Sequence, residues 1–446
     1  MMGFLRDRDF IKWFYPGMHI KRWLLLLMLG VTVMGLGLAY ILREVYVSWT
    51  FPSAFYYLTL QFIPQVVRGA MFMALAIGLI LAAVWKLNDS LLSGVLPHRN
   101  NHESLVNLIY SQRYLRRGPK IVAIGGGTGL SNLLRGLKEY TTNLTAIVTV
   151  ADDGGSSGRL RRELGILPPG DVRNCIAALA DAEPLVTKLF QYRFSEGSGL
   201  AGHSFGNLFI VAMSGVVGNF EEAIRQTSRV LAVRGQIIPS TLTNVTLCAK
   251  IDGARTIEGE SNISDSEAKE RIREVFLLPA NPPPCPEAVR AILEADIVVL
   301  GPGSLYTSVL PNLLVDGIKR AVVASPALKL YVCNVATQPG ETDGFGVAEH
   351  TATIEEHVGQ SFIHYVLTNS NLDGTPKSPR SQPVQINLPT ANGVRLVLAD
   401  VVSQENHYHH DVKKLGQAVI RIYYDRNQLD QAIAQEELQP AGAAQD

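Results

Sequence analysis

The architecture of this chain follows from Lys120-Ile-Val-Ala-Ile124-Gly125-Gly126-Gly127-Thr128-Gly129, an apolar run that ends in a glycine loop. Short apolar runs rich in β-branched residues are typical of buried strands in parallel sheets. After the loop, apolar residues recur at i, i+3, i+4 and i+7 from Leu130 to Leu137, which predicts an amphipathic helix. A strand, a glycine turn and a helix in succession indicate the start of a βαβ unit.

The glycine loop is a candidate phosphate site. The predicted helix directs its first N–H groups and the positive end of its dipole at the loop, and phosphates bind at such helix ends. The loop is not a Walker A motif, because no Lys-Ser or Lys-Thr follows the glycines, and Leu130 replaces the last glycine of the dinucleotide-binding fingerprint. The alternative is a tight turn with a purely structural role.

Further apolar runs alternate with helical patterns and predict a mostly parallel sheet covered by helices, a Rossmann-like three-layer α/β sandwich. The candidate strands are Lys120 to Ile124, Thr145 to Val150, Val245 to Ala249, Ile297 to Leu300, Ala321 to Ala324 and Leu330 to Val335. The carboxyl ends of parallel strands share one edge of the sheet, and ligands bind in the crevice beside it. We therefore expect the polar loops after these strands to form one site.

The second of these strands runs into an acidic loop rich in serine, Ala151-Asp152-Asp153-Gly154-Gly155-Ser156-Ser157-Gly158-Arg159. Asp152 lies where a Rossmann fold holds a ribose, so it is the candidate contact for a ribose or a metal ion. Adjacent strand residues point to opposite faces, so Asp152 and Asp153 would share a metal only where the chain is already turning. The alternative is an Asp-Gly turn capped by serines.

A proline-glycine segment, Leu167-Pro-Pro-Gly170-Asp171-Val-Arg173-Asn174, leads into an apolar helix. Asp171 is the predicted N-cap of this helix. Arg173 lies in the first turn, where a basic charge opposes the helix dipole, so we expect a bound anion or a carboxylate to compensate for it. An ion pair with Asp171 or Asp181 is the alternative to a bound anion.

Three further segments display polar side chains. In Gly202-His203-Ser204-Phe205-Gly206-Asn207, Asn207 is a candidate ligand contact, and His203 is either a structural residue or an acid–base group. The strand Ile297 to Leu300 enters Gly301-Pro302-Gly303-Ser304-Leu305-Tyr306-Thr307-Ser308, a second glycine turn suited to an anion. The strand that follows ends in a loop with Asn334 and Gln338.

Composition argues against several classes of protein. The 40 basic and 40 acidic side chains cancel, so no overall field favours nucleic acid. The four cysteines lie far apart without a CxxC pair, which is typical of reduced thiols in a cytosolic domain. His407, His409 and His410 with Asp411 could suggest zinc, but no thiolate or spaced partner accompanies them, and we interpret them as a solvated helix start.

Two apolar runs near the N-terminus predict a transmembrane hairpin. Trp23 to Leu42 has no charged residue over twenty positions, which is enough to cross a bilayer, and Gly69 to Trp85 is shorter but preceded by aromatic residues. Basic residues are concentrated before the first run, so both chain ends are expected in the cytoplasm. The alternative, a cleaved signal peptide, has a shorter apolar stretch of about 7 to 15 residues.

These patterns predict a multi-pass cell-membrane protein with a cytoplasmic globular domain. Its expected parts are a basic cytoplasmic N-terminus (1–21), a two-helix transmembrane hairpin (22–86), a linker (87–117), a Rossmann-like domain (118–425) and a polar tail (426–446).

The order of the motifs closely resembles that of the bacterial gluconeogenesis factor family, which is related to 2-phospho-L-lactate transferase. The resemblance covers roughly Lys120 to Asp425 and is carried by Gly125 to Leu130, Ala151 to Leu160, Gly170 to Asn174, Gly202 to Asn207, Gly301 to Ser308 and Asn334 to Thr342. It implies a CofD-like fold, binding of a UDP-sugar such as UDP-N-acetylglucosamine, and a role in cell-shape and cell-wall control during growth on gluconeogenic carbon. It does not imply enzymatic turnover.

The same resemblance implies roles for individual residues. Gly125 to Gly129 would face a diphosphate, Asp152 and Asn207 the sugar or a metal, and Ser304 and Thr307 the phosphates. In the related transferase this region handles a nucleotide-linked phospholactate, the acceptor is a deazaflavin precursor, and magnesium assists, so Mg²⁺ is the cofactor that the resemblance suggests. The serines of the acidic loop match the gluconeogenesis factors and argue against transferase activity.

The leading hypothesis is a non-catalytic UDP-sugar sensor anchored at the membrane. Its rivals are a transferase of the phospholactate type and a nicotinamide-dependent oxidoreductase, which rests on the glycine loop alone. The expected partners are a UDP-sugar, the membrane and a second copy of the chain, and nucleic acid is not among them. Asp152 and His203 are the catalytic candidates, and Asp152 is the candidate metal ligand. The candidate ligand-binding residues are Gly125, Gly126, Gly127, Thr128, Gly129, Leu130, Asp152, Asp153, Gly154, Ser156, Ser157, Asp171, Arg173, Asn174, His203, Asn207, Gly303, Ser304, Thr307, Asn334 and Gln338.

Overall fold

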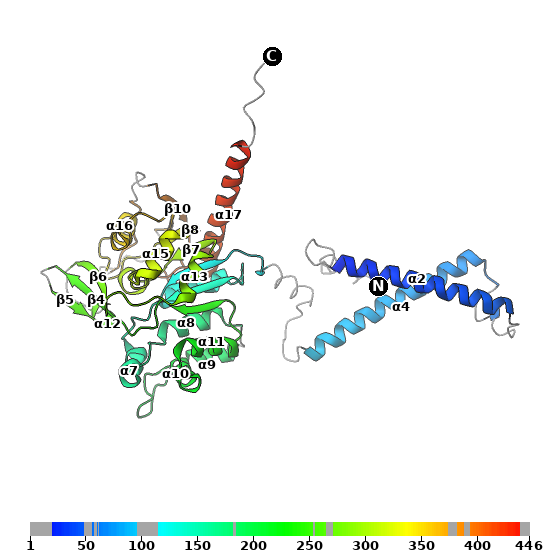
Figure 1. The fold of residues 1–446 in the computed structure, drawn as a ribbon, viewed down its shortest axis with the longest axis horizontal. Coiled ribbons are helices and arrows are strands. Elements are labelled where there is room, and N and C mark those ends of the chain that lie inside the picture. Colours follow the sequence, from blue (N-terminus) through cyan, green and yellow to red (C-terminus); the bar gives the residue numbers. More distant parts are fainter. Residues whose placement is uncertain are drawn as a thin grey trace, which may run out of the picture. The chain divides into compact units, whose positions relative to one another are not determined.

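The computed structural model describes residues 20–48, 56–57, 60, 62–95, 115–181, 184–252, 255–264, 271–372, 381–387 and 393–437. The chain divides into two compact units, residues 1–114 and 115–446 (Figure 1). Most of the predicted N-terminal segment and linker, and the end of the predicted tail, lie outside the described residues.

The first unit contains two long helices, α2 (Ile20–Ser48) and α4 (Gln65–Val95). Within α2, Met28–Val45 is long and apolar enough to cross a membrane, and none of that window is buried. The apolar part of α4, Gln65–Ile80, is shorter than a full span. Helices therefore form at both predicted positions, and among the described residues one of them meets the requirements of a membrane span.

The second unit is built on a seven-stranded sheet in which every neighbouring pair is parallel. In spatial order the strands are β10 (Arg395–Ala399), β9 (Tyr365–Asn369), β8 (Leu328–Val332), β7 (Ile297–Leu300), β1 (Ile121–Gly125), β2 (Leu144–Val148) and β3 (Gln236–Pro239). All five residues of the interior strand β1, which lies between β7 and β2, are buried. This confirms the predicted mostly parallel sheet.

Helices flank this sheet (Figure 1). Those before β7 are α6 (Gly127–Leu137), α7 (Gly155–Leu164), α8 (Gly170–Leu179), α9 (Pro184–Gln191), α10 (Phe205–Val217), α11 (Phe220–Val230), α12 (Glu260–Ser264) and α13 (Pro286–Leu293). Those after it are a π-helix η1 (Leu305–Val309), α14 (Leu310–Leu313), α15 (Asp316–Ala324), α16 (Val347–Val358) and α17 (Val412–Glu437). Helix α6 packs against α8 and α17, and α13 packs against α15.

A small antiparallel sheet extends the second unit, with strands β4 (Thr246–Ile251), β5 (Thr256–Glu258) and β6 (Ile272–Leu278) in the order β5-β4-β6. The predicted strand Val245 to Ala249 thus forms, but it belongs to this sheet and not to the parallel one. In β4 the residues Leu247 to Ala249 and Ile251 are buried, whereas Lys250 is exposed to solvent.

The predicted strand Ala321 to Ala324 is wrong, because these residues end helix α15. A short apolar run fits a buried strand and a helix equally well. Here Ile318, Ala321 and Val322 form the buried face of the helix at spacings of three and four residues, which decides for the helix.

Candidate functional site

A cleft of about 590 Å³ lies at the carboxyl edge of the parallel sheet, where β1, β7 and β8 end in polar loops. It is lined by Gly126–Gly129 with Asn132, Pro302–Ser304 with Thr307 and Ser308, Asn334–Pro339 with Glu341, and by Glu260, Ser264, Ser381 and Tyr408–His410. Small-molecule sites commonly enclose about 300–1,000 Å³, so the cleft has the size of a ligand site.

The two glycine loops meet backbone to backbone in this cleft. A Cβ atom added to Gly129 would lie 2.5 Å from the carbonyl oxygen of Pro302, and one added to Gly303 would lie 3.3 Å from the carbonyl oxygen of Gly126. Gly127 also has a φ of +64°, in the left-handed region that favours glycine. The two loops therefore need glycine both for their close approach and for their backbone conformation.

Side-chain hydrogen bonds hold the second glycine loop. The Asn334 side-chain amide accepts a hydrogen bond from the N–H of Gly303 (3.2 Å) and donates one to the Gly303 carbonyl oxygen (2.9 Å). The Ser304 hydroxyl oxygen accepts hydrogen bonds from the backbone N–H of Thr307 (3.1 Å) and from the Thr307 hydroxyl (2.7 Å). The loop continues into the π-helix η1, a form found frequently at functional sites.

Three carboxyl groups gather beside the first glycine loop. Asp171 lies so close to Gly126 that a Cβ on that glycine would be 2.4 Å from the Asp171 Oδ2. Burial and then the charge of Asp152 raise the pKa of Asp171 to about 7. Burial and then the charges of Asp152 and Asp171 raise the pKa of Glu260 to about 8. These shifts mean that the cluster resists holding several negative charges at once.

Asp171 does not cap its helix as predicted. Helix α8 begins at Gly170, its cap residue is Pro169, and no side chain caps it. The Asp171 carboxylate accepts a hydrogen bond from the backbone N–H of Gly127. The proline turn brings Asp171 one residue inside the helix, so its side chain reaches the neighbouring loop.

The two aspartates of the acidic loop have different surroundings. Asp152 accepts a hydrogen bond from the N–H of Gly154 (2.9 Å), and burial raises its pKa. Asp153 accepts hydrogen bonds from the N–H (2.9 Å) and hydroxyl (2.8 Å) of Ser261 in α12. Asp152 thus belongs to the carboxyl cluster, whereas Asp153 attaches the acidic loop to the small antiparallel sheet region.

A buried polar network lies behind Asp152. The Ser156 hydroxyl is 3.0 Å from the Nδ1 atom of His203 and accepts a hydrogen bond from the Asn207 side-chain amide (3.0 Å). The same amide is 3.5 Å from the Ser157 hydroxyl, which donates in turn to Asp152. The network supports Asp152, and its arrangement favours the structural interpretation of His203, whose pKa burial lowers.

Among the described residues Arg173 forms no ion pair with Asp171 or Asp181, the two partners of the alternative interpretation, although the charge of Asp171 acts to raise its pKa. It donates to the Asn174 side chain (2.7 Å), and its buried Nε has no hydrogen-bond partner among the described residues. Asp181 instead forms an ion pair with Arg234. Asp181, one of the two partners considered in the ion-pair alternative, is therefore not paired with Arg173, because the chain carries Asp181 to the far end of α8, beside the start of β3.

The predicted ligand-binding residues fall into two groups. Those that line the cleft are Gly126, Gly127, Thr128, Gly129, Gly303, Ser304, Thr307, Asn334 and Gln338. Those that are not among its lining residues are Asp152, Asp153, Gly154, Ser156, Ser157, Asp171, Arg173, Asn174, His203 and Asn207, together with Gly125, which ends β1, and Leu130, which is buried in the core.

Several residues of the cleft were not predicted from the sequence. Glu260 and Ser264 come from α12, and Glu341 lies in the loop after β8. His410 also lines the cleft, and it is buried with its Nε2 atom 3.2 Å from the carbonyl oxygen of Cys333. Burial lowers the pKa of His410 to about 4, so the predicted solvated helix start is wrong for this residue.

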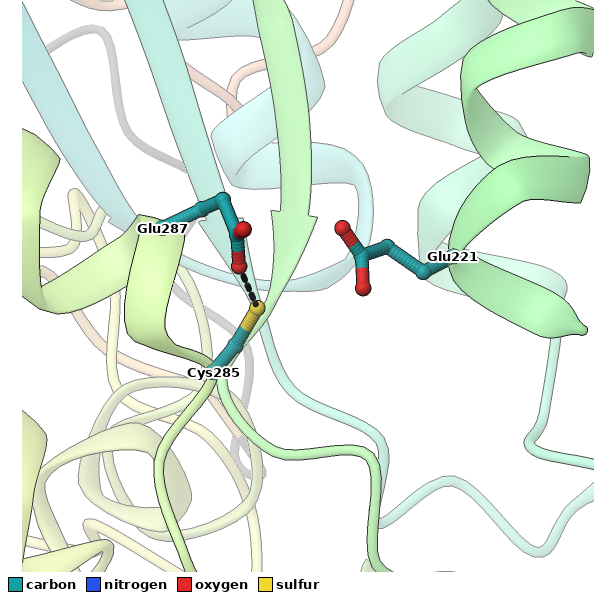
Figure 2. Close-up of side chains that lie close together, drawn as sticks. All are labelled: Glu221, Cys285 and Glu287. Carbon is teal, nitrogen blue, oxygen red and sulfur yellow. Dashed lines mark hydrogen bonds between the residues drawn. The ribbon is translucent and has the colours of Figure 1, made fainter.

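A second cluster of potential metal ligands lies outside the cleft and comprises Glu221, Cys285 and Glu287 (Figure 2). The Cys285 thiol is 3.2 Å from the Glu287 carboxylate, and Glu221 forms an ion pair with Arg225. Burial and the bond to Glu287 raise the pKa of Cys285 to about 11, so the thiol keeps its proton. The existing contacts account for this cluster without an ion.

Comparisons with known proteins agree with this geometry. The family model described as 2-phospho-L-lactate transferase CofD matches residues 121–403. The gluconeogenesis factor of Bacillus subtilis (strain 168) is 46% identical over 310 residues, covering 68% of this chain and 97% of its own length. A relative in Nostoc sp. (strain PCC 7120 / SAG 25.82 / UTEX 2576) is 45% identical over 430 residues, covering 94% of this chain and 93% of its own length.

A solved structure shows the same fold. The crystal structure of a UPF0052 family protein from Bacillus halodurans is 44% identical, covers 68% of this chain and 99% of that chain, and superposes with a TM-score of 0.64. Since the family model spans most of the globular unit and the relatives are this similar, the chain belongs to the 2-phospho-L-lactate transferase CofD family, among the members named gluconeogenesis factor.

Proposed function

We propose that the cleft binds a UDP-sugar, with UDP-N-acetylglucosamine as the candidate ligand. The protein then acts as a non-catalytic sensor in cell-shape and cell-wall control during gluconeogenic growth. The choice of UDP-sugar and the cellular role follow from the family resemblance. The relatives support the metabolic context by their name, gluconeogenesis factor.

The observation that carries the proposal is the contact of two glycine loops across one cleft. Each loop follows a parallel strand, and together they line the cleft with backbone at Gly126–Gly129 and Pro302–Ser304. Backbone N–H groups of such loops and of the helix that follows bind phosphate oxygens. Two such loops that face each other can each bind one of the two phosphates of a nucleoside diphosphate.

Magnesium fits the carboxyl cluster chemically. Asp152 and Asp171 offer carboxylate oxygens, the ligands that Mg²⁺ prefers, and burial raises the pKa of both. A divalent cation held by these two residues would supply the positive charge that a diphosphate needs beside an acidic cluster. The proposed sensor function does not depend on this cation.

The proposal predicts binding without turnover. Titration of the full-length chain in detergent with UDP-N-acetylglucosamine is expected to release heat, and Asp152→Asn is expected to lower the Mg²⁺-dependent affinity at least about tenfold. The measurement is isothermal titration calorimetry with and without Mg²⁺, followed by analysis of the recovered nucleotide. Glu405→Gln, at an exposed position, is the control for loss of one negative charge. Failure to bind any nucleotide sugar would refute the sensor.

A transferase of the phospholactate type is the second candidate function, and the carboxyl cluster favours it. In such a reaction the cluster would bind a metal, and the loops would position an acceptor hydroxyl that attacks the donor phosphorus while the nucleotide leaves. Product formation that requires both Asp152 and Mg²⁺ would establish this activity in place of the sensor.

The N-terminal unit suggests attachment to the cell membrane, with the globular unit in the cytoplasm. Helix α2 supports one span, and the proposed hairpin adds a second through the apolar part of α4. Deletion of residues 1–86 is therefore expected to move the chain from the membrane fraction to the soluble fraction, as measured by fractionation and immunoblotting.

A reporter fused to the N-terminus tests the hairpin separately from the anchor. Two spans place both chain ends in the cytoplasm, whereas a single span places them on opposite sides. An N-terminal tag accessible from outside intact cells would show that α4 does not cross the membrane. Unchanged localisation of the deletion variant would refute the anchor itself.

A further inference from the structure

Glu341 is a buried carboxylate in the wall of the cleft, with an exposed fraction of 6%. It accepts hydrogen bonds from the Ser304 hydroxyl and from the N–H of Tyr306, and the Ser264 hydroxyl lies 3.4 Å away. Its acceptor oxygens are thus supplied with donors by the protein itself. Glu341 has no need of a ligand hydroxyl to complete its hydrogen bonding.

The hydroxyl groups of the second glycine loop form a relay that ends at Glu341. The Thr307 hydroxyl donates to Ser304 (2.7 Å), and the Ser304 hydroxyl donates to Glu341. A serine or threonine hydroxyl has a single proton to donate. Both hydroxyls that were expected to bind ligand phosphate are therefore already donating within the protein.

The charge of Glu341 opposes an incoming anion as well. The cleft wall also contains Glu260, whose pKa is raised by burial, by Asp152, Asp171 and Asp153, and by Glu341. A phosphate near Ser304 thus meets a negative charge and finds the hydroxyl donors occupied. Replacement of Glu341 by glutamine would remove the repulsion of the phosphate. It would also make the hydroxyl donors easier to displace, because a neutral amide is a weaker acceptor than a carboxylate.

We propose that Glu341 determines which anions the cleft accepts, because a ligand phosphate must take the Ser304 and Thr307 hydroxyls away from its carboxylate. A simple anion such as inorganic pyrophosphate gains too few contacts to do so. A nucleotide sugar gains further contacts through its base and sugar, and these drive the exchange. The inference rests on the proposed nucleotide-sugar site and specifies how that site rejects small phosphates.

A double-mutant cycle tests the competition. The full-length chain, Glu341→Gln, Ser304→Ala and the double variant are titrated with inorganic pyrophosphate and with UDP-N-acetylglucosamine. Glu341→Gln is expected to bind pyrophosphate roughly tenfold to a hundredfold more tightly than the unmodified chain. This gain should be clearly smaller in the Ser304→Ala background, where only the relief of charge repulsion remains, because the hydroxyl that the substitution frees is then missing.

Glu260→Gln is the matched control when all variants are titrated at a pH above the Glu260 pKa of about 8, because it then removes an ionised carboxylate from the same cleft but leaves the relay in place. A gain in pyrophosphate affinity equal to that of Glu341→Gln would overturn the inference and assign the effect to charge alone. Weaker binding by Glu341→Gln would also overturn it and make Glu341 a direct ligand contact. Thermal unfolding of each variant verifies that the fold is retained.

The cycle separates the inference from the proposed function. If UDP-N-acetylglucosamine binds to the unmodified chain and Glu341→Gln leaves the affinity for pyrophosphate unchanged, the inference is wrong and the proposed function stands. If no variant binds the nucleotide sugar while Glu341→Gln gains affinity for pyrophosphate, the competition is real and the ligand is a different phosphate compound. If neither ligand binds to any variant, both proposals fail.

Discussion

Gly129→Ala is expected to weaken binding of UDP-N-acetylglucosamine by roughly a hundredfold, because separated loops lose at least one hydrogen bond to a charged phosphate, worth about 1.5–3 kcal/mol. The added Cβ would lie 2.5 Å from the carbonyl oxygen of Pro302 and 2.8 Å from its carbonyl carbon. Both are backbone atoms and cannot rotate away, so the two glycine loops must separate. Calorimetric titration of the full-length chain measures the loss of affinity.

Gly215→Ala is the matched control for this substitution. It makes the same chemical change in helix α10, where the added Cβ would meet no atom within 4 Å. The affinity of this variant is expected to equal that of the unmodified chain. A Gly129→Ala variant that folds and binds the nucleotide sugar with full affinity would show that the contact between the loops does not shape the site.

Gly136→Ala is expected to lower the free energy of unfolding of the globular unit by about 3 kcal/mol, the upper part of the usual range for an overpacked core. Helices α6 and α17 touch at backbone level here, and the added Cβ would lie 2.2 Å from the carbonyl oxygen of Val412 and 3.1 Å from the Cα of Gly416. Alanine favours a helix over glycine by only about 1 kcal/mol, so the steric cost prevails.

Urea denaturation monitored by near-ultraviolet circular dichroism measures this effect, again beside Gly215→Ala. At that open helical position alanine is expected to raise the stability by up to about 1 kcal/mol. The two substitutions therefore have opposite expected signs. A Gly136→Ala variant as stable as the unmodified chain would mean that α17 moves away from α6 without loss of packing.

Local sequence patterns were sufficient where several signals agreed. At β1 and α6, an apolar β-branched run, a glycine loop and a helical spacing of leucines all indicate the same structure, and both elements form. At Ala321–Ala324 only one signal was present, a short apolar run, and the prediction was wrong. The strands β3, β9 and β10 were not predicted, and they carry the sheet to both of its edges.

The polar loops of the site were predicted, but the contacts that their individual residues make were not. Asp152 and Asp153 are neighbours in the chain, yet one joins the carboxyl cluster and the other binds Ser261. Ser304 and Thr307 line the cleft as the motif suggests, but their hydroxyls donate hydrogen bonds within the protein, Thr307 to Ser304 and Ser304 to Glu341. No local pattern marks Glu260, and although Glu341 lies within the motif Asn334 to Thr342, its role depends on Ser304 and Ser264, which are far away in the sequence.

Four properties could be predicted from the sequence alone: the parallel α/β class, the positions of the loops that end its strands, the apolar helix near the N-terminus and the family. These are properties of short segments, since periodicity, glycine and charge act within a few residues along the chain. The folded structure was needed to show which loops touch, which carboxyl groups lose water and which hydroxyl donates to Glu341. Those properties depend on distances through space, because desolvation and Coulomb interactions arise from packing between distant segments.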